Sequence, residues 1–253
     1  MTRLFPSSLM GCLVPCESQG ELEHWMTLEA DGSVVAARAQ PDAVSWSDEG
    51  TERRHTPDAE VRFDDGRVVL REVKPWSDLS SAARAAVDHR TAVLQASLAC
   101  EGITYELVNS KSPAFGRRVA SAKQVLAARR ATIRPGLDLL VREAVLLRGG
   151  STLGCIERLI PHARREELLV LVLRRKLIVD LEQGSICPRT SVRIPNALRK
   201  ETNQWLPCCV CVGTTTSCVT GYDTACCPEQ RTAKSTSCAL TTSQPLRSKK
   251  RLL

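Results

Sequence analysis

The chain has 253 residues, of which 43% are hydrophobic, 25% are charged and 4% are aromatic. This composition excludes a wholly disordered or fibrous chain, and the length suggests one large domain or two small ones. No run of about 18 apolar residues occurs, so we expect no transmembrane helix. The N-terminus lacks the pattern of a signal peptide. We therefore expect a cytoplasmic protein with no membrane partner.

Charge is divided unevenly along the chain. Residues 1–110 carry 10 basic and 18 acidic side chains, a net charge of −8. Residues 111–253 carry 25 basic and 10 acidic side chains, a net charge of +15. Because DNA is a dense polyanion, we expect residues 111–200 to supply most of the attraction to DNA or to a DNA-bound partner. The alternative is that their arginines pair with nearby glutamates and only keep the surface soluble.

Residues 1–110 predict an α/β domain with a mixed sheet. Ser18 and Glu21 have the spacing of a capping box, which begins a helix over Glu17–Ala30. The turn Asp64-Asp65-Gly66 predicts a β-hairpin. In chain order, we expect strands over Ser33–Ala39, Ala43–Ser47, Ala59–Phe63 and Arg67–Val73, a long helix over Leu79–Cys100, and a strand over Ile103–Val108.

Short helical segments follow after about residue 110. We expect helices over Phe115–Ala131, Gly136–Arg148, Thr152–Ile160 and Arg165–Arg175, then a strand over Lys176–Asp180 within a small hairpin between Leu177 and Val192. This order favours a smaller winged-helix-like domain over residues 111–200, with an ordinary helical subdomain as the alternative.

Residues 201–253 contain seven of the twelve cysteines. Their spacing is irregular and no histidine lies among them, which is not typical of a zinc site. We expect this segment to be a cysteine-rich, disordered tail, with structural zinc as the alternative.

The strongest chemical signal lies at one end of the predicted hairpin. Asp58 begins its first strand and Glu72 and Lys74 end its second, so Asp58 lies roughly opposite Glu72, and Glu72 shares a face with Lys74. Two carboxylates at this range repel each other and call for a cation. Asp58, Glu72 and the carbonyl of Val73 would supply the oxygen ligands that Mg²⁺ prefers, with Mn²⁺ as a substitute. Lys74 would orient or activate a water, or stabilise the phosphate.

Pro57-Asp58 followed by Glu72-Val73-Lys74 matches the PD-(D/E)xK nuclease pattern. The same pattern also occurs by chance in surface hairpins. His55 is the only histidine near the site. It could act as a general base, but we favour the alternative that it is only a polar residue on the strand that leads to the site. If the pattern marks a nuclease, we expect substitution of Asp58 or Glu72 by Ala to abolish cleavage of the DNA strand and to leave the fold intact.

Further sequence pieces surround this pattern in a consistent order and spacing. They are Phe5-Pro6-Ser7, Glu17-Ser18-x-x-Glu21, Gln40-Pro41, Arg53-Arg54-His55-Thr56-Pro57-Asp58, Asp65-Gly66 and Glu72-Val73-Lys74-Pro75. With them, residues 5–195 resemble the TnsA-type endonuclease subunit of heteromeric transposases. The resemblance implies a restriction-endonuclease-like core over residues 1–110, followed by the family's helical C-terminal domain. It also implies catalytic roles for Glu21, Asp58, Glu72 and Lys74, and metal ligation by Glu21, Asp58, Glu72 and Val73.

In that family, the subunit cuts the strand at each transposon end that its partner transposase does not cut. The resemblance therefore implies a Mg²⁺-dependent DNA endonuclease whose partners are double-stranded DNA at transposon ends, an integrase-like transposase subunit and an AAA+ ATPase regulator. Cys12, Cys16 and the cysteine-rich tail depart from the family pattern. Two alternative functions stay open: a non-catalytic DNA-binding or adaptor protein that keeps a nuclease-like core, and, after it, a soluble structural protein. For Glu21, a capping-box role alone is also open.

Overall fold

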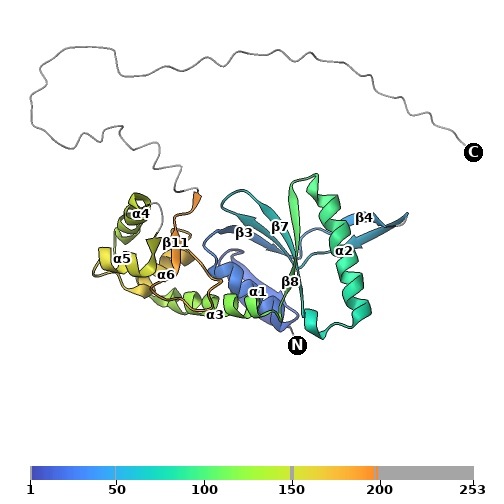
Figure 1. Ribbon diagram of the computed structural model, residues 1–253, viewed down its shortest axis with the longest axis horizontal. Helices are drawn as coiled ribbons and strands as arrows, with labels where there is room; N and C mark the ends of the chain where they lie inside the picture. Colours follow the sequence, from blue (N-terminus) through green and yellow to red (C-terminus); the bar gives the residue numbers. More distant parts are fainter. Residues whose placement is uncertain (1, 49, 149–150, 197, 199–253) are drawn as a thin grey trace, which may run out of the picture. The chain divides into compact units, whose positions relative to one another are not determined.

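The computed structural model describes residues 2–48, 50–148, 151–196 and 198 (Figure 1). These residues form a mixed α/β protein with helices α1–α6, which confirms the coarse fold class. The tail expected over residues 201–253, with its seven cysteines, lies outside the described residues. Among the residues that are described, no helix is both long enough and apolar enough to span a membrane.

The central element is a four-stranded mixed sheet with the order β3-β6-β7-β8. Its strands are β3 (Val34–Ala39), β6 (Ala59–Phe63), β7 (Val68–Lys74) and β8 (Ile103–Asn109). β7 runs parallel to β8 and antiparallel to β6, so the expected hairpin and the mixed sheet are both confirmed. Gly66 has a φ of +93° in the hairpin turn, a conformation that glycine adopts without steric cost.

The two faces of this sheet are covered by different helices (Figure 1). Val61 and Val69 pack with Trp25 and Leu28 of α1 (Gln19–Ala30). Leu70 instead packs with residues of α2 (Ser81–Ala99) and with Tyr105 of β8. Because side chains alternate along a strand, the odd positions of β7 face α1 and the even positions face α2.

Two hairpins outside this sheet were only partly predicted. β1 (Arg3–Ser7) pairs with β2 (Cys12–Cys16), and neither strand was expected. β4 (Val44–Asp48), an expected strand, pairs with β5 (Thr51–His55). β5 was missed because its sequence, TERRH, contains no apolar residue and four of its five residues are exposed. The β4–β5 hairpin matters for the site because it ends at His55.

The remaining helices are α3 (Pro113–Ala127), α4 (Leu137–Leu147), α5 (Leu153–Leu159) and α6 (Arg165–Leu173). They confirm the four helices expected there, although α3 ends earlier because a 3-10 turn, η2 (Ala128–Arg130), follows it. The expected hairpin is also present: β10 (Ile178–Val179) pairs with β11 (Ser191–Arg193), which pairs on its other edge with β9 (Ser151–Thr152). α6 is the innermost helix, since its residues from Glu167 to Val172 are all buried.

Two of the C-terminal helices, α3 and α6, pack against α1. α3 lies along α1, and Arg118 of α3 forms an ion pair with Asp31 at 2.7 Å. Nη1 of Arg175 donates a hydrogen bond to the carbonyl of Glu29 at 2.9 Å. The boundary proposed near residue 110 falls in the connection between β8 and α3 and stays a prediction.

Candidate active site

The hairpin brings Asp58 to the end of β7 that carries Glu72 and Lys74. Ala59 lies opposite Arg71 in the register, so Asp58 is the first residue beyond the paired part of β6. The backbone N–H of Val73 donates to Oδ2 of Asp58 at 2.7 Å. Since the N–H and C=O of one strand residue point to the same side, the Val73 carbonyl also faces this edge. Asp58 and Val73 therefore meet at this edge, and Glu72 is close enough for its charge to raise the pKa of Asp58.

Glu72 is the centre of a buried network of donors. Its side chain is only 1% exposed. Its Oε1 atom lies 2.9 Å from Nζ of Lys74 and accepts a hydrogen bond from Arg90 of α2 at 3.0 Å. Its Oε2 atom accepts from the hydroxyl of Tyr105 at 3.1 Å and contacts Nε2 of His55. A carboxylate has about four lone-pair sites, so these four donors occupy all of them.

The network sets the charge states of its members. Burial alone would raise the pKa of Glu72, but the hydrogen bonds from His55 and Lys74 outweigh it and lower the pKa to about 2. Burial likewise disfavours the charge on Lys74, and the hydrogen bond to Glu72 overcomes this and raises its pKa. Burial and the nearby Glu72 charge raise the pKa of the Tyr105 hydroxyl. At neutral pH, Glu72 is thus an anion and Lys74 a cation.

Asp58 is in the opposite situation. Burial raises its pKa, and the negative charges of Glu72 and Glu21 add to this, while the Val73 N–H and Lys74 oppose it. Within the described residues, its Oδ1 atom accepts no hydrogen bond. Asp58 is therefore a partly buried carboxylate with a free oxygen, surrounded by two further carboxylates.

Glu21 reaches this edge from the first turn of α1. The Ser18 hydroxyl accepts from the Glu21 N–H at 3.1 Å, which confirms Ser18 as the N-cap. The Glu21 carboxylate accepts from the Ser18 hydroxyl at 2.8 Å and from the N–H of Glu17 at 3.0 Å, in place of the Ser18 N–H that a capping box would use. It is also close enough to Asp58 to raise the pKa of that residue. Gly20 makes this approach possible, because a Cβ atom there would lie 2.7 Å from Cβ of Ser110 and 3.4 Å from Val73. Capping and proximity to the site are thus compatible.

Sequence reasoning missed two residues of the network, Arg90 and Tyr105. Arg90 lies in an Ala-rich helix and Tyr105 in an apolar strand, so neither interrupts its local pattern. Tyr105 is brought to Glu72 by the parallel register of β7 and β8. This register places Tyr105 opposite Leu70, which lies on the same face of β7 as Glu72. His55 was considered as a base, whereas its ring is engaged with Glu72.

The donor set fits a divalent cation in part. No group of three or more His, Cys, Asp or Glu side chains in the described ranges is arranged as a ready metal site. The uncommitted Oδ1 of Asp58 and the carbonyl edge of Val73 nevertheless offer hard oxygen ligands beside excess negative charge, which Mg²⁺ prefers. Glu72 would bind a cation only by releasing one of its four donors. We conclude that Asp58 and Val73 fit the metal directly and that Glu72 does so after rearrangement.

No protein-family model matches this chain, and a search of curated proteins finds no match.

Proposed function

We propose that this chain is a metal-dependent DNA endonuclease, of the TnsA type, that cleaves one strand at transposon ends. It would act with an integrase-like transposase and an AAA+ ATPase regulator on double-stranded DNA. The single observation that supports the proposal most is the gathering of Asp58, Glu72 and Lys74 at one strand end, with Glu21 in electrostatic range. A cytoplasmic location, a restriction-endonuclease-like core and a winged-helix-like C-terminal domain belong to the same proposal.

The proposal assigns a distinct task to each residue. Asp58, the Val73 carbonyl, Glu21 and Glu72 would hold Mg²⁺, which when bound supplies a Lewis acid for the scissile phosphate. Lys74 keeps its proton on Nζ because Glu72 raises its pKa. We therefore favour stabilisation of negative charge on the phosphate as its role, in place of proton removal from water. Arg90 and His55 hold the Glu72 carboxylate in place.

The alternative, a non-catalytic DNA-binding or adaptor protein, is favoured by one observation. All four lone-pair sites of Glu72 are already occupied by protein donors. A buried carboxylate of this kind also serves to tie β7, β8, α2 and β5 together without any reaction. Under this alternative, Glu72 is a structural ion-pair centre and Asp58 takes no part in metal binding.

Two measurements on the full chain decide between the endonuclease and the non-catalytic adaptor. Cleavage of a transposon-end duplex is followed with purified partners and Mg²⁺, and Mn²⁺ binding to the chain alone is followed by calorimetry. We expect Lys74→Ala to abolish cleavage and Asp58→Asn to abolish both cleavage and Mn²⁺ binding. Lys74→Arg should not restore activity, because a planar guanidinium differs from an ammonium in reach and donor geometry.

Lys111→Ala is the matched control. Lys111 is an exposed lysine that pairs with Asp78 at 3.7 Å and lies outside the network. The Lys111→Ala variant should cleave the transposon-end duplex and bind Mn²⁺ as the unaltered chain does. Full cleavage by Lys74→Ala would exclude the proposed role of the lysine, and Mn²⁺ binding that survives Asp58→Asn would favour the adaptor.

A further inference from the structure

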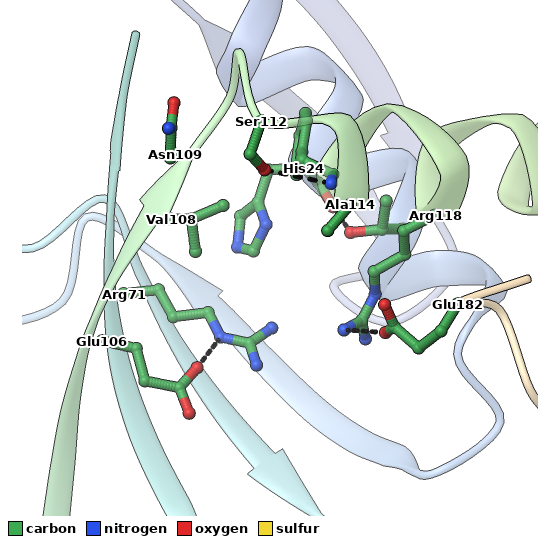
Figure 2. A pocket seen from close by; sticks show the side chains of 11 residues that line it. His24, Arg71, Glu106, Val108, Asn109, Ser112, Ala114, Arg118 and Glu182 are labelled. Carbon is green, nitrogen blue, oxygen red and sulfur yellow. Dashed lines mark hydrogen bonds and ion pairs between the residues drawn. The ribbon is translucent and has the colours of Figure 1, made fainter. Parts of the chain in front are cut away.

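A second polar site lies on the other face of β7, where α1 and α3 meet the sheet (Figure 2). It is a cavity of about 190 Å³. Its walls come from α1, β7, β8 and the start of α3, and the residues that matter here are His24, Arg71, Glu106, Ser112 and Arg118. None of these belongs to the Glu72 network.

Arg71 presents an unused guanidinium edge to this cavity. Its side chain is 9% exposed, and its Nε donates to Glu106 at 2.9 Å. Its two terminal nitrogens make no hydrogen bond to any described residue, and Figure 2 shows them directed into the cavity and away from Glu106. A guanidinium fork of this kind is the geometry that binds carboxylates and phosphates through two parallel hydrogen bonds.

Two further buried nitrogens in the same cavity have no partner among the residues that the structure describes. Nε2 of His24 is unpaired although the residue is only 2% exposed. Nε of Arg118 is also buried and unpaired, while its terminal nitrogens bind Asp31 at 2.7 Å and Glu182 at 3.0 Å. Buried polar atoms are nearly always satisfied in native proteins, so unpaired donors gathered in one cavity call for an acceptor.

We propose that this cavity binds an oxyanion of the phosphate class, held by the terminal nitrogens of Arg71 and by Nε2–H of His24. Two guanidinium groups and a neutral imidazole line this cavity, and each of the three has at least one nitrogen that makes no hydrogen bond to a described residue. Three carboxylates, Glu106, Asp31 and Glu182, pair with the two guanidinium groups, so the cavity has no net positive charge and these carboxylates compete with the ligand. The proposal therefore rests on the unpaired donors and not on net charge.

The electrostatics agree with this assignment. Burial lowers the pKa of Arg71, and the charge of Arg118 lowers it further, against the opposing effect of Glu106. Burial also lowers the pKa of His24 well below its ordinary value, with Arg71 and Arg118 adding to the shift. An anion among these groups would relieve both effects.

The size and wall of the cavity point to a small ligand. Pockets for drug-sized molecules usually have about 300–1,000 Å³, so 190 Å³ suits a phosphate group and not a whole nucleotide. α3 begins at this wall, with Ser112 as its N-cap. A helix N-terminus favours negative charge, which adds to the effect of the side chains. The source is either a free phosphate ion or a single phosphate of a DNA backbone.

The proposal does not depend on endonuclease activity, because Arg71 and Glu72 point to opposite faces of β7. The test is titration of the full chain with inorganic phosphate, followed by calorimetry and by the ³¹P line width. We expect saturable binding to the unaltered chain. Arg71→Gln should weaken it about tenfold or more, because hydrogen bonds to charged groups are lost.

A second variant keeps the test informative if Arg71→Gln folds poorly. Glu106→Gln removes the carboxylate that competes for Arg71, so phosphate should bind about threefold more tightly. Arg62→Gln is the matched control, since Arg62 is an exposed arginine on the neighbouring strand and pairs with Glu60. It should leave binding unchanged.

The outcomes separate clearly. Absence of saturable phosphate binding, or weaker binding in Glu106→Gln, would overturn the proposal. Loss of binding in Arg62→Gln equal to that in Arg71→Gln would also overturn it, since the effect would then be general charge. Where the proposal holds, competition by a short duplex identifies a backbone phosphate as the source, and no competition identifies the free ion.

Discussion

The two faces of β7 carry opposite arrangements of charge. On the α2 face, one carboxylate, Glu72, is surrounded by four donors and has no lone pair left. On the α1 face, the adjacent residue Arg71 donates to one carboxylate, that of Glu106, and its terminal nitrogens make no hydrogen bond to a described residue. One strand thus presents a saturated anion to one side and an unsaturated cation to the other.

The two faces therefore differ in how their buried polar groups contribute to the free energy of unfolding. Protein donors satisfy every lone-pair site of the Glu72 carboxylate. Removing this side chain would leave those donors unpaired and would lower the free energy of unfolding. The α1 face contains nitrogens whose partners are not supplied by the described residues. Such groups cost stability unless a ligand satisfies them. The first face should therefore respond to mutation through stability and the second through ligand binding.

The largest expected effect comes from breaking the Glu72 network. Glu72→Ala leaves Lys74, Arg90 and Tyr105 without their shared acceptor, and removal of one partner of a buried ion pair costs about 3–5 kcal/mol. The expectation that Ala at this position leaves the fold intact therefore does not agree with these contacts. We expect a large drop in the free energy of unfolding, measured by urea titration, together with loss of cleavage.

Asp58→Asn provides the contrast within the same site. Its carboxylate is destabilised by burial and by two neighbouring carboxylates. Removal of its charge should hold or raise stability while cleavage is lost. If both variants lost the same stability, the two carboxylates would not differ as described.

Acid should weaken the α2 face. The pKa of Glu72 falls from 4.5 to about 2 in the folded chain. A lowered folded pKa gives stability that is present above about pH 4.5 and is lost as the pH falls toward 2. We expect the unfolding free energy of the unaltered chain to fall across this window, and that of Glu72→Gln to fall less.

Glu167 supplies an internal reference for this measurement. Hydrogen bonds to Arg164 and Arg134 lower its pKa to about 2, far from β7. Its contribution should persist in Glu72→Gln, so a residual slope is expected. Identical slopes for both proteins would show that Glu72 contributes nothing to acid sensitivity.

Much of the local structure follows from local sequence signals. The Ser18–Glu21 capping box and the Asp64-Asp65-Gly66 turn have short-range physical causes, and they give α1 and the β6–β7 hairpin within two residues. The pairing of Asp58 with Glu72 follows from that turn. Arg90, Tyr105 and β5 could not be predicted in this way, because their roles depend on the parallel β7–β8 register and on packing of α2. His24 and Arg71 could not be predicted to line one cavity either. His24 lies in α1 and Arg71 in β7, and only the packing of the helix on the sheet brings them together.

The distance between α1 and the strand ends can be tested through Gly20. Gly20→Ala places a methyl group against Ser110, so we expect a loss of about 1–3 kcal/mol from overpacking and lower cleavage. Ser110→Gly in the same chain should restore both. Gly116→Ala in α3 has no atom within 4 Å of the new methyl and should stabilise by about 0.5–1 kcal/mol. Failure of the Ser110→Gly rescue would mean that the contact does not position Glu21.

The smallest effect concerns exposed arginines of the C-terminal helical region, and it rests on the proposed function. Many C-terminal basic residues are paired, as Arg118 with Asp31 and Arg165 with Glu157, which reduces the attraction expected from net charge alone. The buried state of α6 also prevents that helix from entering a DNA groove. Arg129, Arg130, Arg174 and Lys176 are exposed and have no ion pair with a described residue, and η2, which carries the first two, packs against α6.

We therefore expect Arg129→Gln with Arg174→Gln to weaken duplex binding by the full chain and to make its salt dependence shallower. Each lost phosphate contact reduces the slope of log K against log salt by about 0.9, so two lost contacts would reduce it by roughly 2. Arg38→Gln with Arg62→Gln is the control pair, since both arginines are exposed but already bound to Asp42 or Glu60. Fluorescence anisotropy at two salt concentrations gives the comparison. Equal losses in the two double variants would show that unpaired arginines have no advantage over paired ones, and attraction to DNA would then follow overall charge.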